Sequence, residues 1–176
     1  PKNFFRNKKL YWQGTGDRLD EVAFYNQDNK DIEVNMKDAL CLGNGKYFMP
    51  AYNGNAVLVR TEDRVIIYNL ETEKNAYLDG NFCNSVISPN GRYVAVRSNS
   101  QINTIQVYDI TDMNNMRSVA SLDYINMDDF VFSPDGSKLI VWANGIGEVI
   151  VWNLTTINNP TSRSLITTSC INVIFN

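Results

Sequence analysis

The chain has 176 residues, of which 44% are hydrophobic and 11% aromatic, and it carries 16 Lys plus Arg against 19 Asp plus Glu, a formal net charge of -3. This length and apolar content are enough to bury one domain-sized core. The charge excludes broad attraction to nucleic acid or to an anionic membrane. The apolar runs also fall far short of the roughly 20 residues that span a bilayer. We therefore expect neither direct nucleic-acid binding nor membrane insertion.

The sequence contains no histidine, which excludes Ser-His-Asp, Cys-His and histidine-containing zinc sites within these residues. Its three cysteines, Cys41, Cys83 and Cys170, have no C-x-x-C spacing. We interpret them as free buried thiols in the cytoplasm or another intracellular reducing compartment. Phosphate-binding glycine motifs are also absent from the sequence, so no cofactor is expected.

A tight turn between two apolar runs recurs in the middle of the chain. Residues 88–96 (SPNGRYVAV) and 133–141 (SPDGSKLIV) lie 45 positions apart. In both, proline fixes φ at the first turn position, and Asn-Gly or Asp-Gly tolerates positive φ, which is typical of hairpins. Such a period predicts an array of equivalent structural units.

The same pattern can be followed in chain order. The first copy has strands at 3–5, 10–12 (LYW) and 21–26 (EVAFYN), and the second has a weaker turn within 51–61 (AYNGNAVLVRT). Each later copy has a third strand that closes with an aromatic and then a polar residue. These strands are at 65–70 (VIIYNL), 105–110 (IQVYDI) and 149–154 (VIVWNL). The predicted repeat bounds are 1–37, 38–80, 81–124 and 125–169, with 171–175 (INVIF) as the first strand of a further copy.

Each copy predicts four antiparallel strands, and no segment has a helical period, so the expected class is all-β. Four-stranded units of about 43 residues fit the blades of a β-propeller, in which each sheet buries its faces against two neighbours. We expect about four blades here, as part of a larger ring of about seven. A β-sandwich is the alternative fold, and a closed four-bladed ring is the alternative arrangement.

Residues 132–136 (FSPDG) and 149–154 (VIVWNL) resemble the turn and the strand ending of the WD-repeat family. The resemblance spans nearly the whole chain and implies a propeller that binds partner proteins through its loops or blade sides. The chain departs from the family because it has no Gly-His pair, and its closing pairs are Tyr25-Asn26, Tyr68-Asn69, Tyr108-Asp109 and Trp152-Asn153. Secreted bacterial propellers with Pro-Asp repeats share the same turn.

In such a propeller the loops between second and third strands share one end with the loops that lead to the next blade. Amide, acidic and aromatic side chains at that end suit recognition of proteins or peptides. The candidate partner-binding residues are Asp79, Asn81, Phe82, Asn99, Gln101, Asn103, Tyr124, Asn126, Asp128 and Asn144.

We therefore expect a non-catalytic interaction scaffold that is part of a multiprotein assembly. The alternative is a propeller hydrolase, with active residues outside this segment or at Asp128 and Asp129, which precede the predicted inner strand at 130–132. A subunit held permanently inside a large assembly is a third possibility.

Overall fold

The structure is a computed structural model, and it describes part of the 176-residue chain. The described residues are 8–13, 21–26, 40–41, 47–51, 55–70, 72, 74–124, 127–143, 147–157 and 159–166. The predicted strands at 3–5 and 171–175 lie outside them.

Fifteen strands are described, arranged in four antiparallel sheets. The first sheet has the order β1-β2-β3, and the other three have four strands each in chain order, β4 to β7, β8 to β11 and β12 to β15. The strands are β1 (Lys8–Gln13), β2 (Glu21–Asn26), β3 (Leu40–Cys41), β4 (Tyr47–Pro50), β5 (Ala56–Arg60), β6 (Arg64–Asn69), β7 (Lys74–Asp79), β8 (Phe82–Ile87), β9 (Tyr93–Ser98), β10 (Thr104–Asp109), β11 (Arg117–Asp123), β12 (Asp129–Phe132), β13 (Lys138–Ala143), β14 (Glu148–Asn153) and β15 (Thr161–Ile166).

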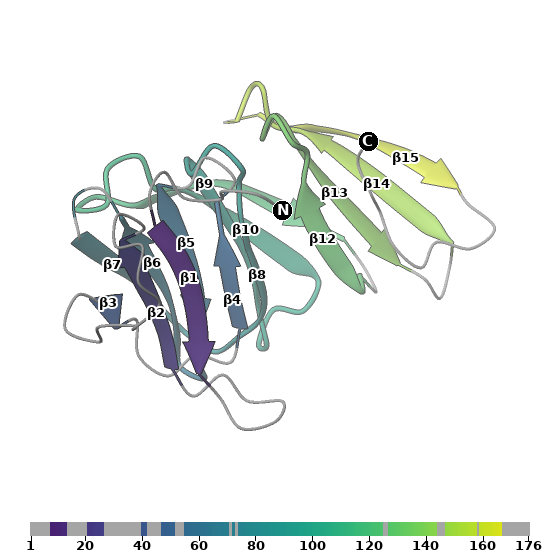
Figure 1. Ribbon diagram of the computed structural model, residues 1–176. Coiled ribbons are helices and arrows are strands. Elements are labelled where there is room, and N and C mark those ends of the chain that lie inside the picture. Colours follow the sequence, from purple (N-terminus) through teal and green to yellow (C-terminus); the bar gives the residue numbers. More distant parts are fainter. Residues whose placement is uncertain are drawn as a thin grey trace.

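The second, third and fourth sheets follow one another in space as they do in sequence. Strand β8 contacts β4, β5 and β6 of the sheet before it and β12 of the sheet after it. In Figure 1 the strands β7 and β15 lie at opposite outer edges of this series. The all-β class and the four-stranded antiparallel units that the sequence predicts are thus confirmed, and the sheets are placed as propeller blades are.

The core fills the spaces between successive sheets, because each strand sends alternate side chains to opposite faces. On β9, Val94 and Val96 pack against the second sheet, with Leu58 and Ile67 among their neighbours in the same cluster. Ala95, on the other face of β9, belongs to the cluster shared with the fourth sheet. A run of consecutive buried residues such as Tyr93 to Val96 is what a strand covered on both faces requires.

The two strong turns have the same hydrogen bonds. The Ser88 and Ser133 hydroxyls each accept a bond from the backbone N–H five residues on, at 2.8 and 2.9 Å. The backbone N–H groups of Gly91 and Gly136 donate to the carbonyls of the same serines, and their φ angles are 69° and 70°. The turn chemistry predicted at 88–91 and 133–136 is therefore observed, with glycine at the position that needs positive φ.

One predicted boundary differs from the strand pairing. Leu40 and Cys41 form β3, which pairs with β2 at Phe24 and Ala23. They therefore lie in the first sheet, whereas the expected bounds placed residues 38–80 in the second copy. Two residues are too short for a recognisable hydrophobic alternation, so only the pairing reveals them.

In the described part of the chain, no helix has the length and apolar character needed to cross a membrane.

The turn at 133–137 predicts an acid-sensitive contribution to stability. The Asp135 carboxylate accepts bonds from the Ser133 hydroxyl at 2.6 Å, the Ser137 N–H at 3.0 Å and the Ser137 hydroxyl at 2.7 Å. These bonds, the Ser133 bond foremost, hold the pKa of Asp135 well below its usual range. A lowered folded-state pKa stabilises the protein above the unfolded value of about 3.9, and this stabilisation is lost as pH falls below it.

Urea denaturation at pH 7, 5, 4 and 3 should therefore show a smaller loss of stability on acidification in Asp135→Asn than in the unmodified chain. Asp123→Asn, an exposed residue at the end of β11, serves as the control. Equal pH dependence in the unmodified chain and Asp135→Asn would contradict this explanation.

Candidate functional site

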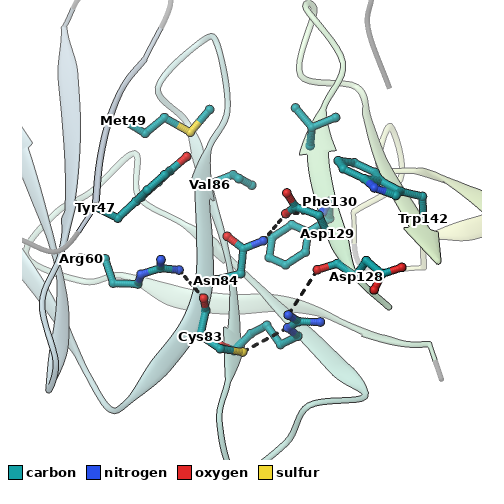
Figure 2. A pocket seen from close by; sticks show the side chains of 12 residues that line it. Tyr47, Met49, Arg60, Cys83, Asn84, Val86, Asp128, Asp129, Phe130 and Trp142 are labelled. Carbon is teal, nitrogen blue, oxygen red and sulfur yellow. Dashed lines mark hydrogen bonds between the residues drawn. The ribbon is translucent and has the colours of Figure 1, made fainter. Parts of the chain in front are cut away.

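A pocket of about 490 Å³ opens where the first strands of three successive sheets approach one another. It is bounded by β4, β8 and β12 and by the paired ends of β5, β9 and β13 (Figure 2). The lining residues are Tyr47, Met49, Arg60, Cys83, Asn84, Val86, Arg97, Asp128, Asp129, Phe130, Val131 and Trp142.

Two repeat positions supply most of the polar lining of the pocket. In the three sheets, the first position is occupied by Tyr47, Asn84 and Asp129, near the start of β4, β8 and β12. Their cross-strand partners occupy the second position, and the pairs are Tyr47 with Arg60, Asn84 with Arg97, and Asp129 with Trp142. Because the sheets repeat, one pair of sequence positions brings six side chains to one site.

Arg97 joins the third sheet to the segment that leads into the fourth. Its Nη1 donates to the Met127 carbonyl at 2.6 Å and its Nη2 to the Asp128 carbonyl at 3.4 Å. Its Nε donates to the Cys83 sulfur at 3.1 Å, and the thiol in turn donates to the Arg97 carbonyl. The guanidinium group is therefore held at three points, which fixes one wall of the pocket.

Arg60 makes the equivalent connection one sheet earlier. Its Nη1 donates to the Cys83 carbonyl at 2.6 Å, and its guanidinium carbon lies 4.9 Å from the centre of the Tyr47 ring. Burial lowers the pKa of Arg60 because it disfavours the charged form. Cys83, the acceptor, sits where the pairing of β8 with β9 shifts register between Phe82 and Asn84.

Asn84 and Asp129 meet across the third and fourth sheets. The Asn84 amide donates to Oδ1 of Asp129, which also accepts the backbone N–H of Phe130 at 2.8 Å. The Asn84 side-chain oxygen accepts the N–H of Ser85 at 2.7 Å, so both ends of the amide are fixed. Burial raises the pKa of Tyr47, and the negative charge of Asp129 raises it further.

Those predicted partner-binding residues that the structure describes lie at the same end of the sheets as the pocket. The Asn99 N–H donates to the Asn81 carbonyl at 2.9 Å, and the two side chains are also hydrogen-bonded. The Gly80 N–H donates to the Asp63 carbonyl at 2.7 Å, and the Tyr124 N–H to the Asn103 carbonyl at 2.8 Å. Backbone bonds thus connect the loops of successive strands into one surface.

We call this surface the loop face and define it by the described residues 61–63, 79–82, 99–103, 124 and 127–128. Asp79 lies 3.7 Å from the Arg64 guanidinium, and Phe82 packs against the core between the second and third sheets. Asn81, Asn99, Gln101 and Asn103 are exposed. Asp128 is exposed and also lines the pocket. Asn126 and Asn144 lie outside the described residues.

Tyr124 differs from the expectation. Its side chain is only 7% exposed and belongs to the core cluster between the third and fourth sheets. Its hydroxyl donates to Glu148 Oε2 at 3.2 Å, and burial together with this bond raises its pKa to about 12. A tyrosine buried in this way is a packing residue rather than an anchor for a partner, because an external group cannot reach its ring.

The sequence prediction did not include Tyr47, Arg60, Asn84, Arg97 or Trp142 as site residues. A signal was available in the shared Val-x-Val-Arg pattern of residues 57–60 and 94–97, with Trp142 at the equivalent position after 139–141. A charged residue that ends two buried strands at one repeat position indicates a common contact. Which partner each arginine contacts depends on the next sheet, which the motif does not contain.

Within the described residues, no group of three or more His, Cys, Asp or Glu side chains is placed to hold a metal ion. The hydrogen bonds of Arg60, Asn84 and Arg97 place donors and acceptors at fixed positions in the pocket. Asp129, one of the two carboxylates named for a hydrolase, lines it and is bonded to Asn84.

No protein-family model matches the sequence, and no curated protein matches it. Solved structures do match. The chain is similar to the β-propeller domain of Cps50 (Swd1) from Myceliophteria thermophila, at 13% identity and a TM-score of 0.59 over 86% of this chain and 55% of that one. It is also similar to a putative 6-phosphogluconolactonase from Bacteroides fragilis, at 12% identity and a TM-score of 0.57 over 86% and 50%.

A third similar structure is Hsv2 from Kluyveromyces lactis, at 17% identity and a TM-score of 0.56 over 83% of this chain and 47% of that one. At these identities the likeness shows the fold alone. The chain therefore has the fold of a partial β-propeller, and it spans about half the length of these structures.

The three bonds of Arg97 predict that this side chain stabilises the junction between the third and fourth sheets. Replacing it in Arg97→Met keeps an apolar stem but removes every donor, and should lower the free energy of unfolding by about 1–2 kcal/mol. Arg117→Met, at an exposed position on β11, is the control and should change it by less than about 0.5 kcal/mol. Urea denaturation followed by tryptophan fluorescence measures both, and equal stabilities for the two variants would contradict the assignment.

Proposed function

We propose that this chain is a non-catalytic platform that binds other proteins or peptides through the loop face. The observation that carries the proposal is the set of backbone hydrogen bonds joining the exposed loops around the pocket. A surface whose loops are already ordered loses less conformational entropy on binding than a mobile one. It can therefore hold a partner with a modest contact area.

The composition of the loop face supports the same function. Ile102 is 59% exposed between Gln101 and Asn103, which are also exposed. An exposed apolar side chain among amides offers a partner one anchor and several orienting hydrogen bonds. The net charge of -3 favours a protein or peptide over nucleic acid as the partner.

The similar structures include the Cps50 (Swd1) propeller domain, Hsv2 and a putative 6-phosphogluconolactonase, and at their low identities the shared fold favours neither binding nor hydrolysis. We favour binding because the pocket residues are engaged in holding the sheets together. Partner binding within a larger assembly, in a reducing compartment where Cys83 stays a free thiol, completes the proposal.

Site-specific crosslinking tests the proposed surface. A photoreactive amino acid replaces Gln101 on the loop face or Asn114 in the loop between β10 and β11, at the opposite end of the sheets; both positions are exposed. We expect Gln101 to give a crosslinked partner, and the crosslink yield should fall when excess unmodified protein competes. The yield should also fall at least about threefold in Ile102→Ser, because an aliphatic side chain that becomes about half buried on binding contributes about 1 kcal/mol.

Equal crosslinking from both positions would place the partner elsewhere. If turnover of a lactone or ester by the full chain were found and abolished in Asp128→Asn/Asp129→Asn, the hydrolase would replace the platform.

A further inference from the structure

The pocket, which adjoins the loop face at Asp128, has two layers. Tyr47, Asn84 and Asp129 form the outer one, and the residues two positions further along the same strands, Met49, Val86 and Val131, form the inner one. Since side chains two residues apart on a strand point the same way, the two sets are stacked. Figure 2 shows Met49 and Val86 near the hydroxyl end of Tyr47, with Arg60 and Cys83 on the other side of the Tyr47 ring. The inner layer is entirely apolar.

The opening of the pocket offers a donor and an acceptor of opposite charge, Arg60 beside Tyr47 and Asp129 in the outer layer. Arg60 donates to the Cys83 carbonyl through Nη1, and among the described residues no acceptor is recorded for its Nη2 and Nε. Asp129 accepts two bonds on Oδ1, whereas for Oδ2 no donor is recorded among the described residues. One side of the opening can therefore donate to a ligand and the other can accept from it.

We infer that the pocket receives an apolar side chain of the Leu, Met or Phe type from an extended segment of the partner, whose backbone carbonyl and N–H face Arg60 and Asp129. This inference rests on the proposed function and specifies what the loop face recognises. A peptide unit carries one acceptor and one donor, which matches the opening. The side chain that projects from the segment then reaches Met49 and Val131, which are half-buried, whereas Val86 is 5% exposed and supports them from the core.

Charged side chains fit this arrangement poorly. An ammonium or carboxylate group entering the inner layer would lose water between the apolar side chains of Met49 and Val131. It would also meet charges of both signs, because Arg60, Arg97, Asp128 and Asp129 all line the pocket. The pocket should therefore discriminate by hydrophobicity rather than by charge.

Peptide pools test this preference directly. The probes are fluorescein-labelled heptapeptide pools, amidated at the C-terminus, whose central residue is fixed as Leu, Met, Phe, Lys, Asp or Gly and whose other positions are mixed. Fluorescence anisotropy with the full chain should show the Leu, Met or Phe pool binding about 10- to 100-fold more tightly than the Gly pool, as burial of one large apolar side chain implies. Tightest binding by the Lys or Asp pool, or no difference among the pools, would overturn the inference.

Matched variants locate the binding. Val131→Thr keeps the shape of a half-buried side chain that lines the pocket but adds a hydroxyl, and should weaken binding of the best apolar pool at least about threefold. Val119→Thr makes the same change on β11 and should leave affinity unchanged. Met49→Gln should weaken it further, and Met49→Leu should not. Unchanged affinity in folded Val131→Thr and Met49→Gln overturns the inference.

The outcomes separate this inference from the proposed function. Specific crosslinking at Gln101 with no apolar preference among the pools would retain the platform and reject the side-chain pocket. Failure of both experiments would reject the platform as well.

Discussion

Burial of both faces of each sheet is the constraint on which the rest of this structure depends. A strand such as β9 has apolar side chains on both sides, with Val94 and Val96 facing one neighbour and Ala95 the other. A sheet of this kind is stable only between two others. The repeat therefore has to form a series, and the series brings the first strands of its members together around a common space.

The pocket is a consequence of that convergence. Its two arginines join neighbouring sheets, because Arg60 and Arg97 each donate to the backbone carbonyl of a neighbouring segment. The fourth sheet has Trp142 at the equivalent position, and this residue packs with Ile140 and Val149 on one face of that sheet. The fourth sheet therefore has no guanidinium group at the position where the second and third sheets have Arg60 and Arg97.

The way in which the polar residues of the pocket are held by their neighbours supports the proposed binding role. Asp129 is held by Asn84 and by the backbone of Phe130, which fixes its carboxylate as an acceptor. Burial raises the pKa of the Tyr47 hydroxyl, and the negative charge of Asp129 raises it further. In the binding role that we propose, these fixed donors and acceptors orient the partner, and the apolar layer beneath them supplies contact area.

The sequence by itself determined the strands, the turns and their order, because each depends on residues close together in the chain. Alternating apolar residues define β9 and β13, and the Asn-Gly and Asp-Gly pairs define the turns. Only the tertiary structure decided that Leu40 and Cys41 complete the first sheet and that Tyr124 is buried. It alone also decided that residues as distant as Tyr47, Arg97 and Asp129 line one pocket. Those facts depend on how one sheet packs on the next, and no local pattern of residues records that contact.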